Sequence, residues 1–186
     1  YSFPRTFGGI DALATATPLA AAQTQTVPLI DLLLGTHGGA LGEICAITLL
    51  VGGIILILTK VISPSIPLTY ICGTFLFKFI LEFGRGVQAG SWGSAFTNIG
   101  GYAYHSLLYI LSGGLLLCAF FMATDYTTSP YTLKGKVVFG VGLAVLTVAM
   151  REWAKAPEGI SYALLIMNLL VPYINEGFRQ RPLGVK

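Results

Sequence analysis

Long apolar stretches alternate with short polar ones along most of this chain. Crossing the hydrocarbon core of a bilayer takes about 20 apolar residues in a helix, and about 17 suffice. Glycines within the stretches are compatible with close contact between membrane helices. The pattern predicts an all-α integral membrane protein with five transmembrane helices, at about residues 40–61, 66–83, 102–123, 135–150 and 159–174.

Two segments interrupt this pattern. Residues 1–39 are rich in Ala, Thr, Gly and Pro, contain no long apolar run, and predict a loop with one short helix after Pro18. Residues 85–101 are rich in glycine and predict a second long linker. We therefore expect two domains: an N-terminal segment over residues 1–39 and a five-helix transmembrane domain over residues 40–186.

Composition supports a membrane protein and excludes several other classes. Of the 186 residues, 54% are apolar and 10% are charged, with a mean hydropathy of +0.76, whereas soluble domains are about 25% charged. The net charge of +3, without a basic run interleaved with aromatic residues, argues against nucleic-acid binding. Three widely separated cysteines and two histidines predict no metal site, and we interpret Cys45, Cys72 and Cys118 as small apolar residues inside helices.

The flanking charges predict an orientation in the membrane. Because positive residues are enriched on the cytoplasmic side, an external N-terminal segment and a cytoplasmic C-terminus fit best. This orientation puts six basic residues inside, namely Lys60, Lys134, Lys136, Arg179, Arg181 and Lys186, and four outside, namely Arg5, Arg85, Arg151 and Lys155. The chain begins at Tyr1 without a signal-peptide pattern, and we expect it to be a C-terminal portion of a longer protein.

The segment with the most chemical content is residues 11–19, with the sequence DALATATPL. Thr17 suits the N-cap of a helix, and Pro18 suits its first position because the N–H that proline lacks would be unpaired there. A simple cap explains these residues. A phosphate esterified to the Thr17 oxygen would also be favoured there by the free N–H groups and the positive end of the helix dipole.

The same segment resembles the flavin-attachment motif of the Rnf complex D subunit and of the B subunit of the sodium-pumping NADH:quinone reductase. The resemblance implies that a dedicated flavin transferase attaches FMN to Thr17 through a phosphoester bond. It also places Asp11, Thr15 and Pro18 in the attachment site. The chain departs from the family by having Ala14-Thr15 where Ser-Gly is usual.

Further segments resemble this family in the same order along the chain. They are LGTHGGALGE at 34–43, IPLTY at 66–70, MATDYTTSP at 122–130, EGISY at 158–162 and MNLLVP at 167–172. The resemblance implies the C-terminal half of a ten-helix subunit, built from two five-helix repeats as in urea transporters. It further implies a bacterial or archaeal plasma membrane and an FMN on the outer face.

The function implied is that of an electron-transferring flavoprotein subunit of an ion-translocating ferredoxin:NAD+ oxidoreductase, coupled to Na+ or H+. Iron–sulfur and flavin partner subunits are implied, and a second, non-covalent flavin such as riboflavin is compatible with the family. No catalytic acid or base is assigned to this chain. The alternatives are the quinone-reducing relative, a flavin-free channel or transporter of similar fold, and a structural scaffold subunit.

Several polar residues in the apolar regions have more than one interpretation. Glu43 could contact the flavin, contribute to an ion path or simply suit the dipole at the start of a helix. The Gly38-Gly39 turn could present N–H groups to the flavin or form only a helix entry. Lys78 and Glu82, four residues apart, predict a local ion pair or a lysine that snorkels to the interface, in preference to an ion relay. Arg85 could be an interfacial residue or a partner of the flavin phosphate, and Asp125 could have a cap or turn role or a functional one. His105 is interpreted as a packed or interfacial histidine in preference to a ligand.

Overall fold

The structure is a computed structural model that describes residues 29–34, 45–89, 98–154 and 159–178. These residues form helices, and none of them lies in a strand. The helices are α2 (Leu29–Leu34), α3 (Ala46–Leu58), α4 (Ser65–Ala89), α6 (Ile99–Leu111), α7 (Leu115–Leu117), the π-helix η1 (Cys118–Met122), α8 (Leu133–Glu152) and α9 (Gly159–Gly177).

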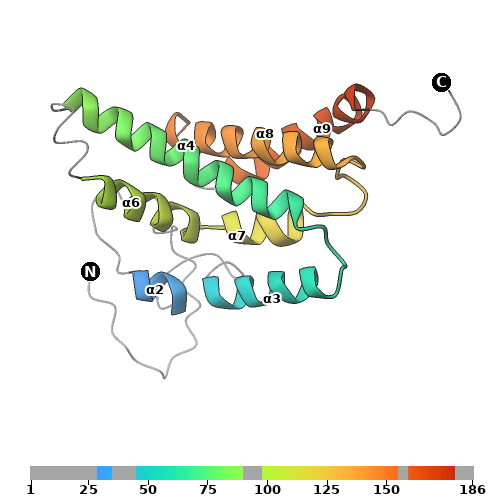
Figure 1. The fold of residues 1–186 in the computed structure, drawn as a ribbon, viewed down its shortest axis with the longest axis horizontal. Coiled ribbons are helices and arrows are strands. Elements are labelled where there is room, and N and C mark those ends of the chain that lie inside the picture. Colours follow the sequence, from blue (N-terminus) through green and yellow to red (C-terminus); the bar gives the residue numbers. More distant parts are fainter. Residues whose placement is uncertain (1–28, 35–44, 90–97, 155–158, 179–186) are drawn as a thin grey trace, which may run out of the picture.

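The longer helices lie side by side and alternate in direction along the chain (Figure 1). The alternation runs through α3, α4, α6 with α7 and η1, α8 and α9, so α4 and α8 point the same way. Among the described residues, α4 and α8 are long and apolar enough to cross a membrane, and α6 with α7 and η1 makes a third if the bent pair is one span. The chain therefore has the architecture of a helical membrane protein.

The α4–α8 contact forms the centre of the bundle, and small residues allow it to be close. The Cβ of an alanine at Gly73 would lie 2.9 Å from the Cβ of Ala144, and one at Gly140 would overlap the side chain of Thr69. Membrane helices use small residues in this way because backbones can then approach each other.

One pair of hydroxyl groups joins α4 and α8 inside this contact. The Tyr70 hydroxyl and the Thr147 hydroxyl lie 2.9 Å apart, and both residues are completely buried. A hydrogen bond between buried polar groups avoids the cost of leaving either one unpaired in an apolar interior.

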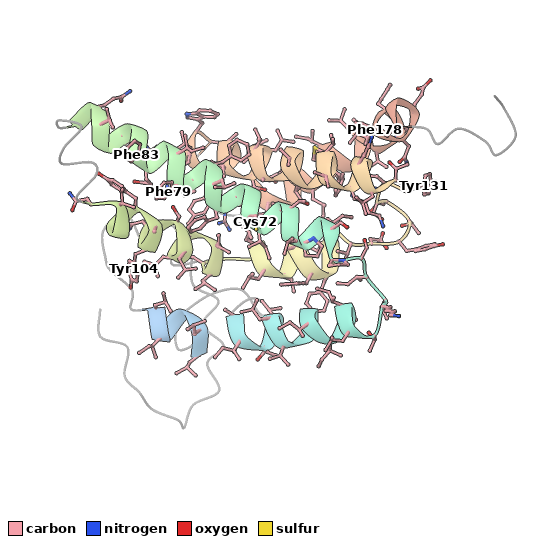
Figure 2. The ribbon with its side chains drawn as sticks, viewed as in Figure 1. Cys72, Phe79, Phe83, Tyr104, Tyr131 and Phe178 are labelled. Carbon is pink, nitrogen blue, oxygen red and sulfur yellow. The ribbon has the colours of Figure 1, made fainter. Side chains whose placement is uncertain are left out.

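Helix α6 meets α4 through aromatic side chains. Phe75, Phe79 and Phe83 stack along α4 with centroid separations of 6.2 and 6.4 Å, and Phe83 meets the edge of Tyr102 on α6 at 6.4 Å. Figure 2 shows Phe79 and Phe83 on the half of α4 that leads to its C-terminal end. This contact helps to bring the first turns of α6 against the last turns of α4.

The helix expected over residues 102–123 is broken. Helix α6 ends at Leu111 and α7 starts at Leu115, with a bend of 66° between the two parts. Ser112 is extended and Gly113 has a φ of +73°, a conformation that glycine adopts without steric cost. The prediction of one continuous helix was therefore wrong at this point.

The structure corrects two further boundaries. The linker predicted over residues 85–101 is too long, because α4 continues to Ala89 and α6 begins at Ile99. Helix α3 covers Ala46–Leu58, a shorter stretch than predicted, and is followed by a turn in which Lys60 has a φ of +57°. Pro67 lies in the first turn of α4, where proline removes no intrahelical hydrogen bond.

Candidate functional site

The residues predicted to hold the flavin lie outside the described part of the chain. They are Asp11, Thr15, Thr17, Pro18, Gly38, Gly39 and Glu43. The helix predicted after Pro18 and the domain boundary between residues 39 and 40 lie there too. These assignments stay predictions, and α2, which the sequence did not lead us to expect, is the described element of residues 1–39.

The described residues contain a second candidate site, a partly buried charge cluster of Lys78, Glu82, Arg85 and Glu152. The Lys78 ammonium lies 2.7 Å from Oε1 of Glu82 and also donates a hydrogen bond to Oε1 of Glu152. Arg85 donates a hydrogen bond to the other oxygen of Glu152 at 2.7 Å, and its Nη1 lies 3.4 Å from Glu82. Two carboxylates therefore converge on one ammonium group.

The cluster is built mainly from α4, with α8 contributing Glu152. Lys78, Glu82 and Arg85 recur at intervals of four and three residues, which places them along one face of α4. The exposed fractions of their side chains rise toward the C-terminal end of α4, from 9% for Lys78 to 23% for Glu82 and 54% for Arg85. Glu152, 13% exposed, is the last residue of α8.

Tyr109 of α6 lies beside the cluster. Its ring centroid is 4.8 Å from the Lys78 ammonium and 4.9 Å from the guanidinium carbon of Arg151. The residue is 6% exposed, and within the described parts of the chain its buried hydroxyl has no hydrogen-bond partner. An aromatic ring attracts cations to its face, so Tyr109 connects the two positive groups.

Arg151 occupies the break between α6 and α7. Its guanidinium donates hydrogen bonds to the carbonyl of Tyr109 at 3.1 Å and to the carbonyl of Ser112 at 3.2 Å. These carbonyls belong to the end of a helix, where acceptors have no intrahelical partner and a positive charge is favoured. A Cβ at Gly113 would lie 2.9 Å from Nη2 of Arg151, so this guanidinium is packed directly on the break.

The sequence predicted part of this arrangement. The Lys78–Glu82 ion pair is confirmed. Glu152 was missed because it is 74 residues away from Lys78 and only the packing of α8 on α4 brings it there. Arg151 was counted among the basic residues of the outer side, which the structure does not test; the sequence did not predict that it is 7% exposed and bonded to the broken helix.

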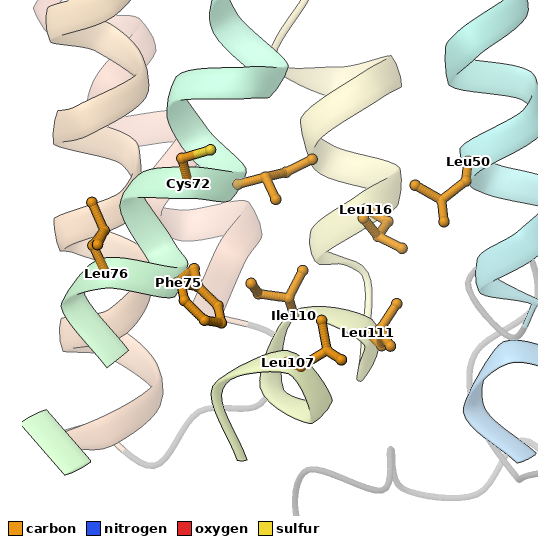
Figure 3. Close-up of a pocket in the computed structure, with 9 residues that line it drawn as sticks. Leu50, Cys72, Phe75, Leu76, Leu107, Ile110, Leu111 and Leu116 are labelled. Atoms are coloured by element: carbon orange, nitrogen blue, oxygen red, sulfur yellow. The ribbon is translucent and has the colours of Figure 1, made fainter. Parts of the chain in front are cut away.

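A separate cavity of about 460 Å³ lies between α3, α4, α6 and α7 (Figure 3). Every side chain that lines it is apolar or a thiol, namely Leu50, Ile71, Cys72, Phe75, Leu76, Leu107, Ile110, Leu111 and Leu116. Specific ligand sites generally add a few placed polar groups to fix orientation, and none of these side chains carries oxygen or nitrogen. The cavity therefore suits hydrocarbon and does not suit the polar groups of a flavin.

Asp125 has a structural role in the loop after η1. Its carboxylate accepts hydrogen bonds from Thr127 at 2.6 Å and from Thr128 at 3.4 Å. The hydrogen bond from Thr127 is the main reason why the pKa of Asp125 lies below its usual value. Of the two interpretations of Asp125, the structure shows the turn; it does not test the functional one.

The chain matches a known family over residues 1–184. It belongs to the NQR2, RnfD, RnfE family. The match includes both the N-terminal segment and the helices that carry the charge cluster. The family is the one whose motifs residues 11–19 and the later segments resemble, so that resemblance is confirmed.

Individual relatives give more detail. One is the D subunit of the Na+-translocating ferredoxin:NAD+ oxidoreductase complex of Acetobacterium woodii, 35% identical over 181 residues, covering 94% of this chain and 50% of that protein. Another is the D subunit of the proton-translocating complex of Clostridium ljungdahlii, 33% identical, covering 90% and 50%. A third is the D subunit of the ion-translocating oxidoreductase complex of Stutzerimonas stutzeri, 33% identical, covering 96% and 51%.

The chain thus spans about half the length of the curated relatives it matches. Two of these relatives are named for different coupling ions, Na+ and H+. The family relationship therefore leaves the ion of the present chain open.

Proposed function

We propose that this chain is part of the membrane flavoprotein known as the D subunit of an Rnf-type complex, and that it carries FMN covalently bound to Thr17. The subunit passes electrons between ferredoxin and NAD+ through this flavin, while the complex moves Na+ or H+ across the plasma membrane. The observation that carries the proposal is the family match over residues 1–184, which includes the motif around Thr17.

The chemistry of residues 11–19 supports the attachment. An FMN linked through its phosphate puts an anion at the oxygen of a residue suited to cap a helix, where free N–H groups and the helix dipole stabilise negative charge. The isoalloxazine ring stays free to exchange electrons. In this scheme the flavin supplies the redox chemistry, and the chain binds and orients it.

The same proposal includes the membrane arrangement. The alternating direction of α3, α4, α6 with α7 and η1, α8 and α9 is what five crossings require (Figure 1). We propose that these crossings form one five-helix repeat of a urea-transporter-like subunit, with Thr17 outside and the C-terminus in the cytoplasm. Iron–sulfur and flavin subunits of the complex are its partners, and a flavin transferase acts on it during maturation.

The quinone-reducing relative is the second candidate. The family model covers both types of subunit, but the relatives named above belong to ferredoxin:NAD+ or ion-translocating oxidoreductase complexes. That observation favours the Rnf assignment. A flavin-free transporter would leave the motif at Thr17 without a purpose.

In-gel flavin fluorescence after denaturing electrophoresis tests the proposal. The complete protein is co-expressed with a flavin transferase of proven activity, as parent, Thr17→Val and Thr24→Val. Thr24 is a matched threonine seven positions further along the chain, outside the motif. We expect a fluorescent band in the parent and in Thr24→Val, and a dark band in Thr17→Val.

A dark parent band would remove the covalent flavin and leave a transporter or scaffold role. A band that persists in Thr17→Val would place the attachment at another residue. With the flavin established, ferredoxin-dependent reduction of NAD+ by the purified complex separates the Rnf assignment from quinone reduction.

A further inference from the structure

We propose that the cavity between α3, α4, α6 and α7 binds one acyl chain of a membrane phospholipid, from the leaflet that borders the turn at Lys60. The inference requires that α4 crosses the membrane, but it does not require a flavin on Thr17. It therefore goes beyond the proposed function, and the two can fail separately.

The first argument is the chemistry of the cavity wall (Figure 3). Among the residues that the structure describes, none of the side chains that line it carries oxygen or nitrogen. Its volume of about 460 Å³ is in the range of whole ligand sites and is many times the space that one water molecule needs. Water inside would find no hydrogen-bond partner on these side chains, so the wall favours an apolar occupant.

The second argument is the place where the cavity opens. Ile110 and Leu116 form its inner wall and are buried. Cys72 and Leu76 of α4 and Leu107 of α6 line it as well, although all three are exposed. Residues that line a cavity and are also exposed mark its opening, which therefore lies between α4 and α6.

The surface outside this opening is also apolar. Leu68, Cys72, Leu76 and Ile80 follow one another at intervals of four along α4, and all are exposed. Residues at this spacing share one face of a helix, and α4 is long and apolar enough to cross a membrane. Lipid tails are as apolar as leucine, so this face suits acyl chains and leads directly into the cavity.

The third argument is the depth of the opening. Cys72 and Leu76 lie seven and eleven residues after Ser65, where α4 begins, which is roughly 10–17 Å along the helix axis. One leaflet contributes about 15 Å to the hydrocarbon core of a bilayer. An acyl chain whose ester group lies near the start of α4 therefore reaches the level of the opening.

Basic side chains lie at the same end of α4. Lys60 is exposed in the turn that joins α3 to α4, two of the helices that line the cavity. Lys136 of α8 donates a hydrogen bond to the Ser63 hydroxyl in this turn at 2.9 Å, so its ammonium lies there too. The carboxylate of Asp125, in the loop before α8, already accepts hydrogen bonds from threonines of that loop. The lysines complement the negative charge of a phospholipid phosphate.

The break between α6 and α7 connects this cavity to the shape of the bundle. Leu111 and Leu116 lie on either side of the break, and both line the cavity. The bend of 66° determines how the two side chains face it. An acyl chain packed against both of them therefore stabilises the broken form of the helix.

The competing occupant is a protein side chain. The curated relatives are about twice as long as this chain, so further helices of such a protein could cover the opening. A helix with its side chains is about 10–12 Å across, so it could close the opening and insert one side chain. That arrangement would leave much of the volume empty, whereas packed interiors contain few voids larger than a water molecule. A thin, flexible acyl chain can fill it.

The test uses the complete protein, with the subunits that copurify with it, in phospholipid nanodiscs. A small fraction of the lipid is a phosphatidylglycerol with a diazirine near the end of one acyl chain. Light couples this chain to the nearest side chains, and mass spectrometry of the peptides locates the adducts. The variant is Leu76→Trp, which places a ring at the opening. Ile80→Trp is the matched control, because the two residues are 56% and 61% exposed, lie four apart on α4, and Ile80 does not line the cavity.

We expect adducts on residues 107–116 in the parent and in Ile80→Trp, and about tenfold fewer in Leu76→Trp. A ring that displaces two methylene groups of the chain weakens its binding by about this factor. Adducts on Leu165 and Leu169, which are exposed on α9, provide the internal reference and should be equal in all three proteins. In-gel flavin fluorescence of the same samples examines the proposed function separately.

Two results would overturn the inference. One is a parent without adducts on residues 107–116 while α9 is labelled; a diazirine-bearing prenyl chain and a benzophenone attached to Cys72 would then show whether an isoprenoid or a protein segment occupies the cavity. The other is equal labelling of residues 107–116 in Leu76→Trp and Ile80→Trp. If Leu76→Trp does not fold, Leu107→Trp with Tyr104→Trp as control decides by the same criterion, because both residues are exposed on α6 and only Leu107 lines the cavity.

Discussion

Arg151 should stabilise the broken helix more than any surface charge does, and Arg151→Met measures this effect. Methionine fills a similar volume without a hydrogen-bond donor, so the carbonyls of Tyr109 and Ser112 lose the bonds that Arg151 now gives them at 3.1 and 3.2 Å. The contact between the guanidinium and the Tyr109 ring is lost as well. All these interactions lie in a buried region, where solvent cannot replace them fully.

The size of the effect follows from those contacts. Hydrogen bonds between membrane helices contribute on average about 0.6 kcal/mol and up to about 1.7 kcal/mol. A cation–π contact adds about 0.5–2 kcal/mol, so the total loss is about 2–5 kcal/mol. For a loss of about 3 kcal/mol, the midpoint of thermal unfolding should fall by about 6–12 °C.

The assay is the thermal midpoint of the purified protein in detergent, measured by the loss of its monodisperse peak in fluorescence-detected size-exclusion chromatography. Lys134→Met is the control, because Lys134 is an exposed basic residue at the opposite end of α8. Arg151→Lys should fall between the two, since an ammonium lacks the planar fork that reaches both carbonyls. If Arg151→Met and Lys134→Met unfold within about 2 °C of each other, Arg151 does not stabilise the break.

Two further predictions concern packing and the loop after η1. Gly53→Ala should destabilise the protein by about 1–3 kcal/mol relative to Gly52→Ala. The reason is that a Cβ at Gly53 would lie 2.5 Å from Cγ of Phe120, whereas a Cβ at Gly52 would lie 3.3 Å from its nearest neighbour, Cζ of Phe121. Equal midpoints of thermal unfolding for the two variants would refute this prediction. The ionised carboxylate of Asp125, whose pKa is lowered, should stabilise this turn at pH values above the ordinary pKa of aspartate. The turn should loosen as the pH falls below about 4 and the carboxylate takes up a proton. Proteolysis of this loop should therefore quicken in acid for the parent but not for Asp125→Asn, which lacks the titrating group.

Local sequence patterns were enough to predict the helices but not all of their ends. The predicted bounds of α8 and α9 lie within a few residues of the observed ones. Burial and the length of an apolar stretch strongly restrict where such a helix can begin and end. The end of α4 was missed because its last turns carry Arg85 between glycines, which in isolation is typical of a linker. In the structure Arg85 is paired with Glu82 and Glu152, so the helix continues through it.

The charge cluster shows the same limit more sharply. The spacing of Lys78 and Glu82 on one helix is a local signal, and it correctly predicted their ion pair. Glu152 belongs to another helix, so its place in the cluster depends on how α8 packs against α4. The glycines at the α6–α7 break were visible in the sequence, but glycine alone is common in membrane helices and does not predict a break.

The end of α8 connects the two unusual features of the bundle. Arg151 and Glu152 are consecutive, and neighbouring residues of an α-helix point about 100° apart. One side chain therefore reaches the carbonyls at the α6–α7 break while the next reaches Lys78 and Arg85 on α4. Tyr109 closes the connection, because its ring contacts both Lys78 and Arg151. A rotation of the last turn of α8 would consequently change both contacts at once, so the ion pairs of the charge cluster and the shape of the broken helix should depend on each other.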